Sequence, residues 1–90
     1  MAAITPFRST PIFDQDTLPA ALRRRHDTKA GVWGVIRVLE GELRLTILDP
    51  VSEGVLTPDK PGLVLPKQPH FVTATGSMKM QVDFYDQPPF

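Results

Sequence analysis

The sequence predicts an all-β chain that folds as an antiparallel sandwich or barrel in one domain, residues 1–90. Several short segments carry apolar residues at every second position, and Gly and Pro separate them at spacings of about ten residues. A chain of 90 residues has room for one modest core, and a small jelly-roll barrel fits this length best. An immunoglobulin-like sandwich is less favoured because its Cys and Trp pattern is absent.

The N-terminal residues 1–11 are expected to form an extended arm along a sheet edge. Pro6 and Pro11 disfavour a helix here, since proline lacks an N–H group and is tolerated at sheet edges. Phe7 and Phe13 are expected to tuck this arm onto the core.

A single helical turn is expected after the arm. Asp14 or Asp16 can cap this turn, which should end near Leu18. Residues 21–28 are then predicted to form a strand, and Gly31 allows the chain to reverse after it.

Residues 33–48 are predicted to form the hairpin around which the rest of the chain packs. The turn falls at Glu40 and Gly41, and Gly reaches the positive φ angle of a tight turn without steric cost. The alternation points one set of residues to the interior: Gly34, Ile36, Val38, Leu43, Leu45 and Ile47. The alternate positions should face water: Arg37, Glu42 and Arg44.

The second half of the chain is predicted to hold a loop and then several strands. Residues 49–54 contain Asp-Pro and Glu-Gly pairs that are typical of a loop. Two short strands follow within residues 54–66, and two longer ones are expected over 70–75 and 78–85. The last strand alternates over eight residues, with these apolar positions: Met78, Met80, Val82 and Phe84.

Composition excludes several classes of function. Ten basic residues balance ten acidic ones, so no net charge attracts nucleic acid or an anionic membrane. Cysteine is absent, which excludes disulfides, thiolate metal ligands and a Cys nucleophile. No apolar run approaches the ~20 residues needed to cross a bilayer, and no signal peptide is evident, so we expect a cytoplasmic protein. Phosphate loops and Ser-His-Asp spacings are also missing.

The two histidines are the strongest candidates for a site. By strand parity His26 and His70 both face the interior, where neutral imidazoles can bind a divalent metal such as Zn, Fe or Mn. A further ligand would come from water or one of four side chains: Glu40, Glu42, Asp83 or Tyr85. The alternative is that each histidine is a half-buried strand residue with a hydrogen-bonded ring.

Three neighbouring residues are candidates for contact with a small ligand. Thr28 shares the parity of His26, and Lys29 can pair with an anionic ligand. Trp33 can form a pocket wall that stacks on a ligand, although such a residue more often packs in the core or at the mouth of a barrel.

The order of several motifs resembles a known family. These motifs are H-x-T-K-x-G-x-W-G from His26, V-L-E-G at the central turn, a Pro-His pair and a Phe-Tyr ending. Together, over residues 10–86, they resemble the TehB/YeaR-like family of small cupin-like domains, which occur alone or in front of a methyltransferase domain in tellurite-resistance proteins. The resemblance implies a double-stranded β-helix barrel and a link to tellurite or other oxyanion stress. It does not imply methyl transfer, because no Rossmann glycine motif is present.

The chain departs from the pattern of metal-binding cupins. In that pattern two histidines and then a glutamate precede the turn glycine, but here Gly34 occupies the glutamate position, and Thr28 and Ala30 lie near the histidine positions. His70, which follows Pro69, does match the histidine of the second cupin motif. Iron oxygenase chemistry is therefore in doubt.

Three hypotheses follow from these residues. The first is a binding barrel, without catalysis, for a small molecule, an oxyanion or a metal held through His26 and His70. The second is a metal-dependent cupin enzyme of unknown substrate. The third is an interaction module, in which the N-terminal arm or an edge strand pairs with a second copy, and we expect a homodimer.

Overall fold

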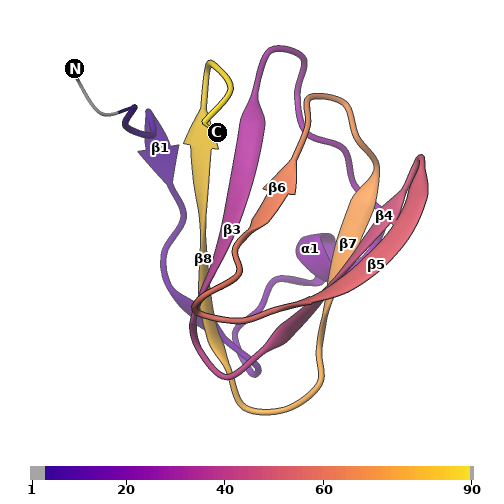
Figure 1. The fold of residues 1–90 in the computed structure, drawn as a ribbon. Coiled ribbons are helices and arrows are strands. Elements are labelled where there is room, and N and C mark those ends of the chain that lie inside the picture. Colours follow the sequence, from indigo (N-terminus) through magenta and orange to yellow (C-terminus); the bar gives the residue numbers. More distant parts are fainter. Residues whose placement is uncertain (1–3, 90) are drawn as a thin grey trace.

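The computed structural model describes residues 4–89 as two antiparallel β-sheets that face each other (Figure 1). One sheet has five strands: β1 (Arg8–Ser9), β2 (Phe13–Asp14), β3 (Trp33–Glu40), β6 (Gly62–Val64) and β8 (Lys79–Tyr85). The other has three: β4 (Leu43–Leu48), β5 (Val51–Leu56) and β7 (His70–Ala74). The only helix in this part of the chain is the single turn α1 (Ala20–Arg23). The expectation of a mostly β chain is confirmed.

The prediction that residues 33–48 form a hairpin is wrong: both strands are present, but they do not pair with each other. β3 pairs with β6 and β8, whereas β4 pairs with β5 and β7, so the two strands belong to different sheets. Alternation shows which side chains are buried, but it does not show which strand lies beside which. The apolar faces of β3 and β4 are buried in one shared core.

The core lies between the sheets, and the predicted inward positions form it. The core residues from β3 and β4 are Ile36, Val38, Leu43, Leu45 and Ile47. From the last strand and the residue before it, Met78, Met80 and Val82 are buried as predicted. Tyr85 is also buried, at 4% exposure, on the outer face of the five-stranded sheet.

The connection between β3 and β4 has the glycine conformation that the sequence predicts. Gly41 has φ +73°, and a Cβ atom at this position would overlap the carbonyl oxygen of Ser77. The turn is therefore packed against the connection between β7 and β8. Gly31 also has φ +73°, as expected for the reversal before β3.

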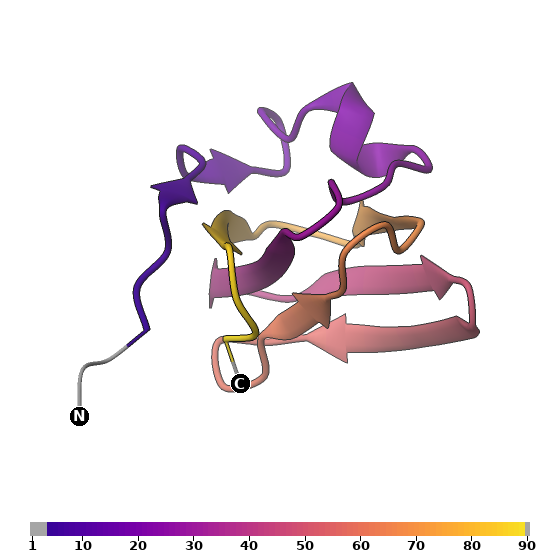
Figure 2. The same ribbon diagram turned by 90° about the horizontal axis from the view of Figure 1, so that it is seen from above.

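The N-terminal segment lies along one side of the sheets (Figure 2). Arg8 and Ser9 pair with Phe84 and Asp83 of β8, so the described part of the arm is extended along an edge as predicted. Residues 1–3 of that arm lie outside the described residues. Asp14 accepts hydrogen bonds from the backbone N–H groups of Asp16 and Thr17, which confirms it as the residue that caps the following turn.

Two predicted segments differ from the structure. Residues 21–28 do not form a strand: the first of them belong to α1, where Ala and Leu favour a helical turn directly after Pro19. Only His26 keeps strand pairing, through an isolated bridge to His70. The predicted loop of residues 49–54 is a tight turn at Asp49 and Pro50 followed by β5, which pairs with β4 along its whole length.

The two sheets do not merge into one continuous ladder within residues 4–89. The isolated bridges are His26 with His70 and Thr57 with Lys60. A closed barrel is therefore not seen, and the observed architecture is a pair of facing sheets. No helix among the described residues is long and apolar enough to cross a membrane.

Candidate functional site

A cavity of about 270 Å³ opens between the sheets at the end where β3 begins and β8 ends. Its walls are mainly apolar side chains from β3, β6, β7 and β8. The N-terminal arm contributes Phe7, Arg8 and Thr10, and the segment after α1 contributes residues 26–29. The cavity therefore combines an apolar interior with a small number of polar groups, which is the usual composition of a ligand site.

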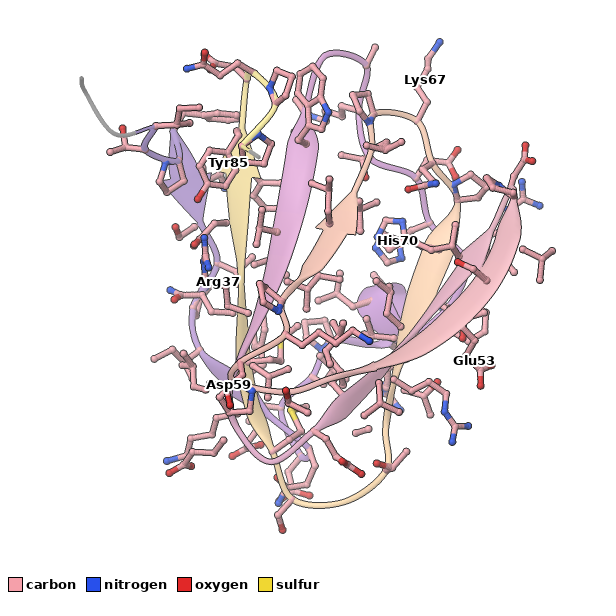
Figure 3. All side chains as sticks on the ribbon, in the orientation of Figure 1. Arg37, Glu53, Asp59, Lys67, His70 and Tyr85 are labelled. Atoms are coloured by element: carbon pink, nitrogen blue, oxygen red, sulfur yellow. The ribbon has the colours of Figure 1, made fainter. Side chains whose placement is uncertain are left out.

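The two histidines lie in contact at this cavity. Their backbones exchange two hydrogen bonds, at 3.0 and 2.9 Å, so His26 extends the three-stranded sheet beyond β7 by one residue. The ring centroids are 4.1 Å apart and the ring planes are inclined by 57°. Figure 3 shows His70 on the inner side of β7, facing the space between the sheets. Both residues belong to the lining of the cavity.

Backbone carbonyl groups determine which nitrogen carries the proton in each ring. The Nδ1 atom of His26 lies 2.9 Å from the carbonyl oxygen of Arg24, and that of His70 lies 2.8 Å from the carbonyl oxygen of Gln68. A carbonyl oxygen can only accept a hydrogen bond, so Nδ1 is the donor in both neutral rings. Each Nε2 atom is then left with a lone pair that can accept a hydrogen bond or bind a metal ion.

The Nε2 atom of His70 is accessible from the cavity. The residue is only 5% exposed. Among residues 4–89, however, every fully buried side-chain nitrogen or oxygen has a hydrogen-bond partner. Since its bonded nitrogen is Nδ1, the Nε2 atom is in contact with open space, and the cavity is the space that this ring lines. His70 therefore presents one acceptor atom to a molecule that enters the cavity.

The surroundings of His70 favour its neutral form. Burial lowers the pKa of its imidazole below the ordinary value, and the neighbouring ring of His26 lowers it further. The carbonyl group of Gln68 and the carboxylate of Asp27 raise this pKa, but their effect is smaller than that of burial. His70 is thus held as the acceptor form near neutral pH.

Two of the three predicted ligand contacts line the cavity. Thr28 is 8% exposed and Lys29 is an exposed residue, and both belong to the lining. Trp33 is not part of the lining. In β3 the inward positions are Gly34 and Ile36, so Trp33 lies on the opposite face of the strand, and the expectation of a tryptophan wall is wrong.

The four predicted additional metal ligands do not reach the cavity. Arg37 donates a hydrogen bond of 2.7 Å to Asp83 and one of 3.3 Å to Tyr85, on the side of β3 and β8 away from His70 (Figure 3). These bonds raise the pKa of the Arg37 guanidinium. Glu40 forms an exposed ion pair with Lys79 at the other end of the molecule, and Glu42 is exposed in the turn that follows.

The donor set for a metal ion is therefore incomplete. No group of three or more His, Cys, Asp or Glu side chains in residues 4–89 is arranged to hold a metal. The hydrogen bonds from Nδ1 to carbonyl groups are nonetheless of the kind that orients metal-binding histidines. The two histidines offer two nitrogen atoms at most, and the other ligands of a metal ion would have to come from water or from a bound molecule.

The arm residues of the cavity could not be found from the sequence. Phe7 and Arg8 line it because β1 pairs with β8 so that Arg8 lies opposite Phe84, and this register depends on the assembled sheet. Phe7 was expected to pack on the core, but it is 57% exposed and lies at the cavity instead. Phe13 does pack against the core.

The structure is that of a small β domain built from two facing sheets with a cavity between them. Residues 8–82 match the family model of the TehB-like domain. The chain belongs to this family.

Curated relatives support this assignment over part of the chain. Two proteins named probable S-adenosyl-L-methionine-dependent methyltransferase TehB, from Haemophilus influenzae strains Rd and 10810, are each 33% identical over 57 residues. Each match covers 59% of this chain and 20% of the relative, so the chain matches about a fifth of the relatives' length. Their methyltransferase activity therefore cannot be assigned to this chain by similarity.

Two solved structures are similar to the fold. The crystal structure of TehB from Haemophilus influenzae aligns with a TM-score of 0.82 and 28% identity over 92% of this chain and 31% of that chain. The crystal structure of an Escherichia coli K12 protein aligns with a TM-score of 0.84 and 22% identity, over 94% of this chain and 92% of that one. The second similarity is one of fold alone.

Proposed function

We propose that this chain is a small cytoplasmic binding domain, a variant of the cupin jelly roll, that holds a small molecule or an oxyanion in the cavity through His26 and His70. It has no methyltransferase activity of its own. Its biological context is resistance to tellurite or related oxyanion stress, in line with its TehB-like family.

One observation carries the proposal: two imidazoles in contact, with centroids 4.1 Å apart, line a mainly apolar cavity of about 270 Å³. The Nε2 atom of His70 is open to the cavity, so a ligand there can donate a hydrogen bond to it. Convergent polar groups in an apolar cavity are the usual sign of a ligand site.

The test is a titration of ¹⁵N-labelled protein with sodium tellurite and with a small-fragment library, followed by amide and imidazole NMR signals. We expect signals of Thr28, Val64 and Val72 to shift with at least one compound, because these residues line the cavity. The shifts should disappear in His70→Phe, which fills the same space but removes the acceptor nitrogen. Shifts confined to the outer face, or shifts that persist in His70→Phe, would contradict the proposal.

A second candidate function is a metal-dependent enzyme with Zn, Fe or Mn. The observation in its favour is the pair of Nδ1 hydrogen bonds to carbonyl groups, which leaves both Nε2 atoms available as ligands. A bound metal would supply Lewis-acid chemistry next to the apolar cavity. Elemental analysis of protein purified without added metal tests this candidate: stoichiometric metal that is lost in His70→Ala supports it, and trace metal that the mutation leaves unchanged contradicts it.

A third candidate is a homodimeric interaction module. β5 is a terminal strand of its sheet in the described part of the chain, and its residues Val51 and Val55 are 82% and 43% exposed. Edge strands with exposed apolar side chains are prone to pair with other strands. Light scattering after gel filtration measures the mass: a dimer that Val55→Lys dissociates supports this candidate, and a monomer at high concentration contradicts it.

A further inference from the structure

The size of the cavity limits what can occupy it. A cavity of about 150 Å³ lined by apolar residues holds one benzene molecule, and this cavity has a volume of about 270 Å³. By this comparison it has room for a body of about ten non-hydrogen atoms. An inorganic oxyanion, with only a few atoms, would leave most of this space to water.

The lining favours an apolar body rather than a bare ion. Apolar side chains predominate in the lining, and those from the sheets are Ile36, Val64, Val72, Met80, Val82 and Phe84. Contact between water and apolar walls is unfavourable in free energy, and an ion that enters such a cavity loses part of its hydration shell. The occupant should therefore replace water with apolar atoms over most of its surface.

The charged groups of the lining favour a single negative charge on the ligand. Arg8 and Lys29 are basic and Asp27 is acidic, so the lining carries one net positive charge when both imidazoles are neutral. Arg8 lies on the arm, and Lys29 belongs to the segment that also carries His26. A carboxylate is the compact monoanionic group that such side chains bind through charge-assisted hydrogen bonds.

Gly34 is the residue that leaves the space open. It lies inside strand β3 and does not have a positive φ angle, so its backbone conformation does not require glycine. A Cβ atom built at this position would lie 3.8 Å from Val82 and 3.9 Å from Val64, which are ordinary van der Waals contacts. Glycine inside a strand is unfavourable for stability. Neither the backbone nor the packing explains this glycine, whereas an open cavity does.

We infer that the cavity takes a mainly apolar carboxylate of about ten non-hydrogen atoms in total, and that Gly34 sets the upper limit of its size. The inference rests on the proposed function and narrows it to one class of ligand. The apolar part occupies the space between the sheets, and the carboxylate lies near Arg8 and Lys29, whose N–H groups donate to it.

Isothermal titration calorimetry with octanoate, propanoate and tellurite tests this inference on the full chain. Octanoate has ten non-hydrogen atoms, and propanoate has the same head without the long body. The five additional methylene groups should make octanoate bind at least about a hundredfold more tightly than propanoate. Tellurite should bind more weakly than octanoate.

Two glycine substitutions separate the cavity from general effects on the strands. Gly34→Val fills the space beside Val64 and Val82 and should weaken octanoate binding by at least about tenfold. Gly54→Val is the matched control, because Gly54 also lies within a strand, has open space around it and does not line the cavity. It should leave octanoate affinity unchanged. If Gly34→Val fails to fold, Gly34→Ala is measured instead and should show a smaller loss in the same direction.

The outcomes distinguish this inference from the proposed function. Equal affinity for octanoate and propanoate, or octanoate binding that Gly34→Val leaves intact, overturns the inference. Tellurite binding that depends on His70, without octanoate binding, overturns the inference and supports the proposed function. Absence of binding by octanoate, tellurite and every fragment overturns both.

Discussion

Glycine has a different structural effect at the two ends of the space between the sheets. At the closed end, a Cβ atom at Gly62 would come within 2.8 Å of Leu56 and 2.9 Å of Leu45, and one at Gly41 would overlap Ser77. At the open end, a Cβ atom at Gly34 would make only ordinary contacts. The closed-end glycines allow tight packing, whereas Gly34 leaves a gap. The comparison teaches that a glycine in a strand has to be judged by what a side chain would meet there.

The largest expected effect is at the closed end. Leu43 is 0% exposed and belongs to the core cluster, so Leu43→Ala should lower the free energy of unfolding by about 3 kcal/mol through lost burial and a new cavity. Urea denaturation followed by circular dichroism measures this loss. Leu39→Ala is the control, because Leu39 is 43% exposed and its truncation should change stability by less than about 0.5 kcal/mol. Similar losses for both variants would mean that the closed end is not tightly packed.

The next effect concerns the turn at that end. Gly41→Ala combines a left-handed backbone, φ +73°, with overlap on the carbonyl oxygen of Ser77. It should destabilise the domain by about 2 kcal/mol. Gly76→Ala is the matched control, since Gly76 lies in the neighbouring turn with nothing within 4 Å and without a positive φ angle. A melting temperature for Gly41→Ala equal to that of Gly76→Ala would contradict the close approach of the two turns.

A pH effect should arise at the open end. The pKa of His70 is lowered from 6.5 in the folded protein, mainly by burial, so the unfolded chain binds a proton in the interval just below 6.5 that the folded chain does not bind. The contribution of this group to stability is therefore complete above pH 6.5 and is lost as the pH falls toward the folded-state pKa.

His70→Gln isolates this contribution, because glutamine does not titrate. Urea denaturation of the wild type and the variant, at about pH 7.5 and at about pH 5.5, brackets the ordinary pKa of histidine. We expect the wild type to lose more stability than His70→Gln on acidification. An equal loss would show that burial of His70 does not disfavour its charged form.

The smallest effect on stability is expected at Gly34. Gly34→Ala should leave the free energy of unfolding unchanged or raise it by less than about 1 kcal/mol, because the new Cβ meets no close contact and alanine lowers the entropy cost of ordering the strand. Thermal denaturation checks this. A loss of more than about 1 kcal/mol would indicate that the strand requires glycine for packing, as Gly62 does at the closed end.

Much of the local structure was predictable from periodicity. The alternation of Met78, Met80 and Val82 marks the inward face of β8, and that of Leu43 and Leu45 marks the inward face of β4. These predictions hold because a strand that buries one face must repeat every two residues. The strand proposed for residues 21–28 failed because only His26 in it pairs, while the residues after Pro19 form a helical turn.

The candidate site was predictable only in part. Strand parity placed His26 and His70 toward one interior, but it did not predict that a single bridged pair makes them neighbours with their rings in contact. Trp33 was assigned to the pocket because of its residue type, yet its neighbour Gly34 takes the inward position. The part played by Arg8 depends on the register between β1 and β8, which leaves no signal in local sequence.

The sequence by itself determined most of the inward positions of the long strands, where Gly41 allows a turn, and the resemblance to the TehB-like family. The tertiary structure alone decided that β3 and β4 belong to different sheets and that a cavity opens beside Gly34. The physical reason is that periodicity records the environment of each residue along one strand. Strand neighbours and the space between sheets depend instead on contacts between segments that are distant in the chain.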